Sequence, residues 1–135
     1  MQPAEHHIAL NAHLLTAQAG YRSAGINGYI ANLLRALPDA DPSLRYTVFA
    51  GPQATVASGP RVRVRRSAWN TTHPLARIVW EQLAQPLALA RAQPDLAHQL
   101  AFVAPVLSRA PFVLTVYDLS FVRYPERLTA ARRWY

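Results

Sequence analysis

The residues best placed to do chemistry lie near the C-terminus, where an apolar run ends in polar side chains. Residues 112–116 are aromatic, aliphatic or β-branched, and Tyr117 and Asp118 follow them directly. The run from 112 to 117 predicts a buried strand of a parallel sheet. In open α/β sheets, ligands bind outside the carboxyl ends of the strands. Asp118 could therefore act as a base, accept a hydrogen bond from a hydroxyl group, or only cap the next turn.

A second group of candidates lies at 20–28, where a loop of small and polar residues leads into a helical pattern. Gly25 and Gly28 would let the backbone approach a phosphate closely, and Arg22 would add positive charge. The spacing is not the full dinucleotide fingerprint, and no acidic residue closes the second predicted strand, so a dinucleotide oxidoreductase is disfavoured. The alternative is that both glycines serve a tight turn and close packing of helix on strand.

His98 ends a predicted strand at 96–98 and would face the same crevice if that strand lies parallel and next to the strand at 112–117. A structural histidine with satisfied hydrogen bonds is the alternative. Glu81 lies on an apolar helix, where we expect a solvated side chain. The histidines have no metal-ligand spacing, so we expect no metal, and the sequence contains no P-loop, nucleophile elbow or zincin motif.

The pattern of apolar residues predicts the elements that position these candidates. In chain order they are a strand at 8–15, a helix at 26–37, strands at 45–50 and 61–65, a helix from 74, strands at 96–98 and 112–117, and a helix from 125. This alternation predicts an α/β fold, a doubly wound, mainly parallel Rossmann-like sheet with helices on both faces. Pro38 should end the first helix, and Pro86 should kink or split the second.

Composition narrows the classes of partner. The sequence contains fourteen arginines and seven acidic residues, which gives a net charge of +7. Such an excess favours nucleic acid, phosphorylated ligands or an anionic membrane surface, although a proteome that prefers arginine would produce it too. The absence of cysteine excludes disulfides and thiolate metal sites. Without an apolar run of about 18 residues or a signal peptide, we expect a cytoplasmic protein, with a peripheral place at the inner face of the membrane as an extension.

Three blocks of sequence carry a resemblance to a known family. They are 21–34 (YRSAGINGYIANLL), 80–98 with WEQL, PL and PDLAH, and 115–126 with TVYDLSF and YPE. In this order they resemble the N-terminal part of family 4 retaining glycosyltransferases of the GT-B fold. The resemblance implies one Rossmann-like, acceptor-side domain over 1–135. Because the sequence ends inside its last predicted helix, we expect an N-terminal piece of a longer protein, with the C-terminal donor domain absent.

The resemblance also implies a reaction and its residues. The parent enzyme would move a sugar from a nucleotide-sugar to a saccharide or lipid-linked acceptor without a metal cofactor. Tyr117 and Asp118 would be the catalytic candidates on the acceptor side. The donor-phosphate and substrate-binding candidates are Arg22, Gly25, Asn27, Gly28 and His98. The second block is most similar to bacterial mannosyltransferases of surface polysaccharide synthesis, which makes GDP-mannose a candidate donor.

Two departures from the family limit this interpretation. Many members carry a histidine where this chain has Tyr117, and a tyrosine with a reference pKa near 10 is a poor substitute for imidazole in proton transfer. The paired glutamates of the donor domain are also absent, so this chain alone should not catalyse transfer.

Two further classes stay open. A stand-alone nucleic-acid- or anion-binding module would use Arg61, Arg63, Arg65 and Arg66, with Trp69 as the one stacking candidate. For nucleic acid this is the weaker alternative, because exposed aromatics do not alternate with the arginines. A structural domain with uncovered apolar surface would self-associate.

Overall fold

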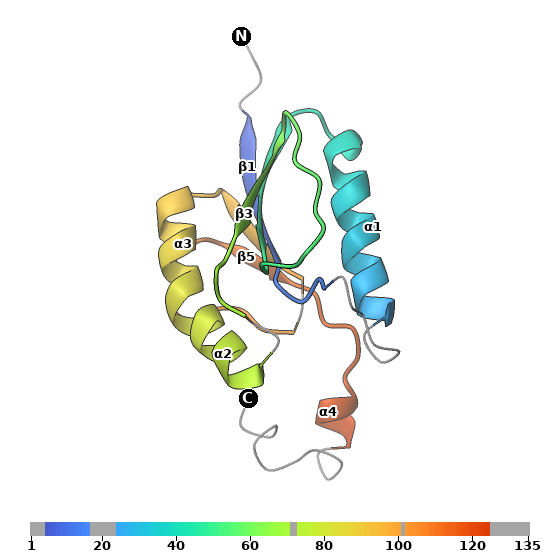
Figure 1. The fold of residues 1–135 in the computed structure, drawn as a ribbon, viewed down its shortest axis with the longest axis vertical. Coiled ribbons are helices and arrows are strands. Elements are labelled where there is room, and N and C mark those ends of the chain that lie inside the picture. Colours follow the sequence, from blue (N-terminus) through green and yellow to red (C-terminus); the bar gives the residue numbers. More distant parts are fainter. Residues whose placement is uncertain (1–4, 17–23, 71–72, 101, 125–135) are drawn as a thin grey trace.

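The computed structural model describes residues 5–16, 24–70, 73–100 and 102–124, and it shows an α/β fold built on one sheet (Figure 1). Five strands pair in the order β3-β2-β1-β4-β5, and every pair is parallel. The strands are β1 (His6–Ala12), β2 (Leu44–Ala50), β3 (Val62–Arg66), β4 (Leu96–Gln99) and β5 (Phe112–Leu114). The predicted parallel α/β sheet is therefore confirmed.

Helices cover both faces of this sheet (Figure 1). On one side lies α1 (Ala24–Ala40). The other side carries a continuous helical segment made of α2 (Pro74–Val79), a π-helical stretch η1 (Trp80–Ala84) and α3 (Gln85–Ala92). A short α4 (Ser120–Arg123) follows the last strand, and the helix predicted from 125 lies outside the described residues.

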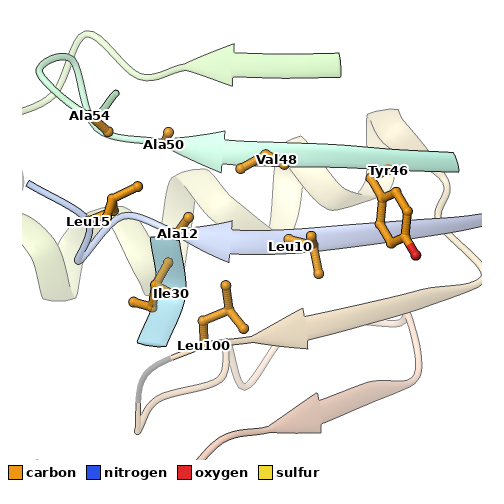
Figure 2. Packing of buried hydrophobic residues seen from close by; sticks show 9 residues of the cluster. All are labelled: Leu10, Ala12, Leu15, Ile30, Tyr46, Val48, Ala50, Ala54 and Leu100. Carbon is orange, nitrogen blue, oxygen red and sulfur yellow. The ribbon is translucent and has the colours of Figure 1, made fainter. Parts of the chain in front are cut away.

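The face under α1 holds the larger apolar core. Alternate residues of β1 and β2 point into it, and Leu10, Ile30 and Leu100 are at most 2% exposed (Figure 2). Full burial of such a side chain contributes about 1.5–3 kcal/mol. Val62 and Val64 of β3 pack against the same core, which leaves the alternating Arg61, Arg63 and Arg65 on the opposite face. The predicted alternation of this edge strand is confirmed.

The face under α2 and α3 has a smaller core and more polar groups. Its buried apolar residues are Ala9, Phe49, Trp80, Leu89 and Ala97. The intervening residues of β1 on this face include His7 and Asn11, which are buried although both are polar. The two faces of the sheet therefore differ in chemistry, and strand position decides which face a residue joins.

Pro38 does not end the first helix, contrary to the prediction, because α1 continues to Ala40. A proline this close to the end of a helix removes one intrahelical hydrogen bond, and the packed apolar stripe of α1 holds the last turn in place. The Leu37 carbonyl accepts a hydrogen bond from the Tyr46 hydroxyl at 3.2 Å. Tertiary contacts thus outweigh the local preference of the residue before proline.

The predicted kink or split at Pro86 takes the form of the π-helical stretch just before it. The Gln85 N–H donates to the Trp80 carbonyl, five residues back, instead of to residue 81. A proline ring clashes with the carbonyl four residues earlier in a regular α-helix, and the wider π turn accommodates it.

Two predicted strands differ from the structure at their carboxyl ends. The first ends at Ala12, because the chain turns there and the Leu15 N–H donates to the Ala12 carbonyl at 3.0 Å. The last is not a buried strand. It stops at Leu114, lies at the sheet edge, and leaves Phe112 and Val113 about half exposed. A strand's place in the sheet order decides its burial, and apolar composition alone does not reveal that order.

Candidate functional site

The carboxyl ends of β1, β4 and β5 and the start of α1 meet at one rim of the sheet, and Tyr117 is central to it. Its ring makes edge contacts with Tyr29 of α1 at 5.4 Å and with Phe102 at 5.3 Å between ring centroids. Its hydroxyl donates to the Leu100 carbonyl at 2.5 Å. Two segments from elsewhere in the sequence, α1 and the stretch that holds Leu100 and Phe102, therefore converge on this tyrosine.

The environment of Tyr117 keeps its proton in place. Burial, with a smaller effect from Tyr29, raises the pKa of the Tyr117 hydroxyl to about 12. The group is thus protonated near neutrality and already engaged with a backbone carbonyl. It suits a positioning role on the rim, and it is not a base at physiological pH.

Asp118, the second catalytic candidate, follows Tyr117 with an exposed side chain. It lies beyond the end of β5, on the side of the sheet where the strands end. The carboxylate is therefore accessible to a ligand at this rim.

Gly25 and Gly28 lie within α1 and not in the loop where the sequence placed them. Neither has a positive φ, and a Cβ atom built on either would meet nothing within 4 Å. The alternative of a tight turn or close helix–strand packing does not explain these glycines, because the described residues leave open space around both. Because neither residue has a side chain, the surface of the first two turns of α1 stays open at the rim.

Asn27 is buried and ties the start of α1 to the segment that follows β1. Its carboxamide oxygen accepts a hydrogen bond from the Thr16 backbone N–H at 2.8 Å. This contact gives Asn27 a structural task in shaping the rim. Arg22, the cationic candidate of the same group, lies outside the described residues.

His98 lies on β4 next to β5, as the predicted parallel pairing required. Its Nε2 atom shares a 2.8 Å hydrogen bond with the Thr115 hydroxyl, and burial lowers its pKa. This geometry fits the structural alternative: His98 joins β4 to the residue that directly follows β5. It therefore holds Thr115, two residues before Tyr117, in place.

A stacked pair at the end of β1 is absent from the sequence-based set of candidates. The ring of His13 lies 3.5 Å from that of Trp80, with 22° between their planes, and both residues are buried. Burial lowers the pKa of His13 to about 4, and the Phe49 backbone opposes part of this effect. No hydrogen bond of ordinary geometry joins either ring nitrogen to a described residue. Burying an imidazole without such a partner costs roughly 1–3 kcal/mol of desolvation free energy.

Three buried amides form a network beside this pair. The Gln99 side-chain oxygen accepts from Asn11 Nδ2 at 3.0 Å and from Gln85 Nε2 at 2.8 Å. The Asn11 oxygen accepts from the His13 backbone N–H at 3.2 Å. The network links β1, β4 and α3, so it fixes where His13 lies.

Glu81 is buried, contrary to the expected solvated side chain. It is 3% exposed and lies next to Trp80 in the π-helical stretch, and its carboxylate is 3.9 Å from the Arg77 guanidinium. The apolar residues around Glu81 in the sequence do not indicate that this carboxylate is buried in an ion pair. The second resemblance block thus faces the sheet with its Trp and Glu, and not the solvent.

The rim as described offers oriented hydrogen-bonding groups and aromatic surface, together with one accessible carboxylate. Tyr117 and His13 both hold fixed protonation states near pH 7. This arrangement suits the binding and orientation of a polar ligand.

Among the described residues, no group of three or more histidine or acidic side chains could hold a metal ion. Within the same ranges, no helix has the length and apolar character required to cross a bilayer. Comparisons with family models, curated proteins and solved structures found no match to this chain.

Proposed function

We propose that this chain is the acceptor-side, N-terminal Rossmann-like domain of a retaining GT-B glycosyltransferase. In this proposal the parent protein transfers a sugar from a nucleotide-sugar to a saccharide or lipid-linked hydroxyl. A donor domain beyond this sequence would hold the nucleotide.

One observation carries the proposal: residues from each of the three resemblance blocks lie at the carboxyl rim of the sheet. Tyr29 of the first block contacts Tyr117 of the third. Trp80 of the second block stacks on His13 at the end of β1. Residues separated by up to 88 positions thus converge where α/β proteins bind ligands. In a parallel sheet the carboxyl ends of the strands and the starts of the following helices share one rim, so this placement is the one that the proposal requires.

The rim residues have distinct roles in this proposal. Asp118 accepts a hydrogen bond from an acceptor hydroxyl, and Tyr117 shapes the acceptor pocket with Phe102. Gly25 and Gly28 leave space at the start of α1 for the phosphates of a donor held by the second domain. Sugar stacking and hydrogen bonding need no side chain with a pKa near 7, which agrees with the fixed protonation states at this rim.

The test is transfer by the full-length gene product. The protein is incubated with labelled GDP-mannose or UDP-glucose and with lipid-linked or saccharide acceptors, and the products are separated. We expect transfer with one nucleotide-sugar, and a large loss in Asp118→Asn. Asp39→Asn is the matched control, because Asp39 is an exposed carboxylate near the other end of α1.

Absence of turnover with all common GDP- and UDP-sugars, in a protein shown to be folded by circular dichroism, would overturn the proposal. Equal activity of the two aspartate variants would instead remove Asp118 from the site.

A further inference from the structure

The sheet face under α3 is only partly covered, and a hollow of 540 Å³ lies where β2 and β3 extend past the helix. Strands β1 to β3 and the loop before β3 form its floor and one wall. The end of α3, with Arg91 and Ala92, forms the other wall. The volume is within the range of about 300–1,000 Å³ that small-molecule sites occupy.

Arginines dominate this hollow because of strand alternation. Val62 and Val64 pack under α1, so Arg61, Arg63 and Arg65 point to the opposite face. The register places Arg63 beside Thr47 and Arg45 beside His7 across the neighbouring strands. Together with Arg91 from α3, five guanidinium groups line one cavity.

The floor of the hollow is polar and ordered. His7 and Thr47 are at most 5% exposed, and His7 Nε2 shares a 2.8 Å hydrogen bond with the Thr47 hydroxyl. Burial lowers the pKa of His7, and the guanidinium groups of Arg45 and Arg63 lower it further. The floor therefore adds hydrogen-bonding capacity but no compensating negative charge.

Most of the arginines in this hollow have no carboxylate partner among the described residues. The residues that line the hollow include no aspartate or glutamate. Arg45 contacts the exposed Glu5 at 3.9 Å, whereas within the described ranges Arg63, Arg65 and Arg91 have no carboxylate within 4 Å. Arg61 instead donates to the Asp41 backbone carbonyl at 3.4 Å. Guanidinium groups gathered around a concave surface whose lining contains no carboxylate repel one another, and an anion would relieve this repulsion.

We propose that this basic hollow binds a compact ligand that carries phosphoryl groups, of the pyrophosphate or sugar-phosphate class. The guanidinium fork matches phosphate oxygens in a bidentate way, and two opposite walls of arginine suit a ligand with more than one phosphoryl group. A nucleic-acid strand fits less well, because Trp69, the nearby exposed aromatic, does not line the hollow.

The hollow is separate from the rim. It lies over the first residues of β1 and β2 and over most of β3, at the other side of the sheet from β5, whereas Tyr117 and Asp118 follow the carboxyl end of β5. Failure of sugar transfer would therefore leave this proposal standing, and failure of anion binding would leave the transferase proposal standing.

Calorimetric titration of the protein with pyrophosphate, at low and at physiological ionic strength, tests the inference. We expect saturable binding that the double substitution Arg63→Gln/Arg65→Gln weakens at least about tenfold, which corresponds to about 1.4 kcal/mol. The matched control is Arg35→Gln/Arg123→Gln, which removes the same charge from exposed sites outside the hollow and should change the affinity less than about twofold. Arg91→Gln, from the opposite wall, should also weaken binding.

Two results would overturn the inference: no binding of pyrophosphate to a folded protein, or equal weakening in both double variants, which would reduce the effect to net charge. Two further arms use vesicles that contain phosphatidic acid and a single-stranded oligonucleotide. Vesicle binding lost in the Arg63/Arg65 variant would identify a lipid phosphate as the source of the same chemistry. Oligonucleotide binding without pyrophosphate binding would contradict a compact ligand.

Discussion

The two faces of the sheet use alternate residues of the same strands, yet one face packs and the other carries polar chemistry. Under α1, residues such as Leu10 and Val48 form a closed apolar core. Under α2 and α3, the adjacent positions are His7, Asn11 and Thr47, all buried and polar. The contrast teaches that a β-strand can stabilise the fold with one set of side chains while the other set remains available for function.

The largest effect should come from the apolar face. Leu10→Ala should lower the free energy of unfolding by about 2–5 kcal/mol, because it removes a side chain that is 2% exposed and leaves a cavity. Leu87→Ala, at a position 58% exposed, is the matched control and should cost much less. Denaturant titration measures both values. Similar losses of unfolding free energy in the two variants would contradict the assignment of Leu10 to a closely packed core.

A second prediction concerns the amide network of the polar face. Gln99→Leu should lower the free energy of unfolding by about 2–4 kcal/mol, because it leaves the Asn11 and Gln85 donors buried without an acceptor. Gln85→Leu should cost less when added to Gln99→Leu than when made alone, since the second change removes one of these unpaired donors. Strictly additive losses in denaturant titration would contradict the network.

The third prediction uses the pH dependence of His13. Its pKa of about 4 in the folded protein is below the unfolded value near 6.5, so the unfolded state binds the proton first as pH falls. The stability present above pH 6.5 is therefore lost progressively down to pH 4. His13→Phe should retain about 2 kcal/mol more of its stability than the wild type between pH 7 and pH 4.5. Equal acid losses, measured by denaturant titration at both pH values, would show that His13 is not held neutral.

Replacing one hydroxyl at the carboxyl rim, outside both apolar cores, should have the smallest effect. Tyr117→Phe removes the hydrogen bond to the Leu100 carbonyl and keeps the ring contacts, so it should cost about 1 kcal/mol. Tyr117→Ala, which also removes the contacts with Tyr29 and Phe102, should cost clearly more in the same thermal or denaturant unfolding measurement. Equal costs would mean that the aromatic contacts do not hold the rim together.

The sequence predicts the parts of the fold that depend on local pattern. Alternating valine and arginine at 61–65 indicated an edge strand, and the strand–helix alternation indicated the parallel sheet. The sequence-based predictions were wrong for features that depend on packing against other elements. Pro38 continues a helix because tertiary packing holds the last turn, and the strand at 112–114 is exposed because it lies at the sheet edge.

The parts of the candidate site that depend on local sequence pattern were also predictable. Tyr117 and the start of α1 follow from the rule that ligands bind at strand carboxyl ends. Asn11 and His13 also gave a local signal: both are polar, and they lie two residues apart on one side of an otherwise apolar segment. Their partners Gln99 and Trp80 come from other elements. Only the strand register and the helix rotation bring these side chains together.

The π-helical stretch has a consequence for how this chain tolerates insertions and deletions. Its hydrogen bond spans five residues, so it holds one more residue than a regular turn at the same axial position. Deleting a single residue from 81–84 would restore an ordinary helix and rotate Trp80 and α2 by about 100° relative to α3. Trp80 would then swing away from His13 while Gln85 kept its place beside Gln99. Length variation here would uncouple the aromatic pair from the amides.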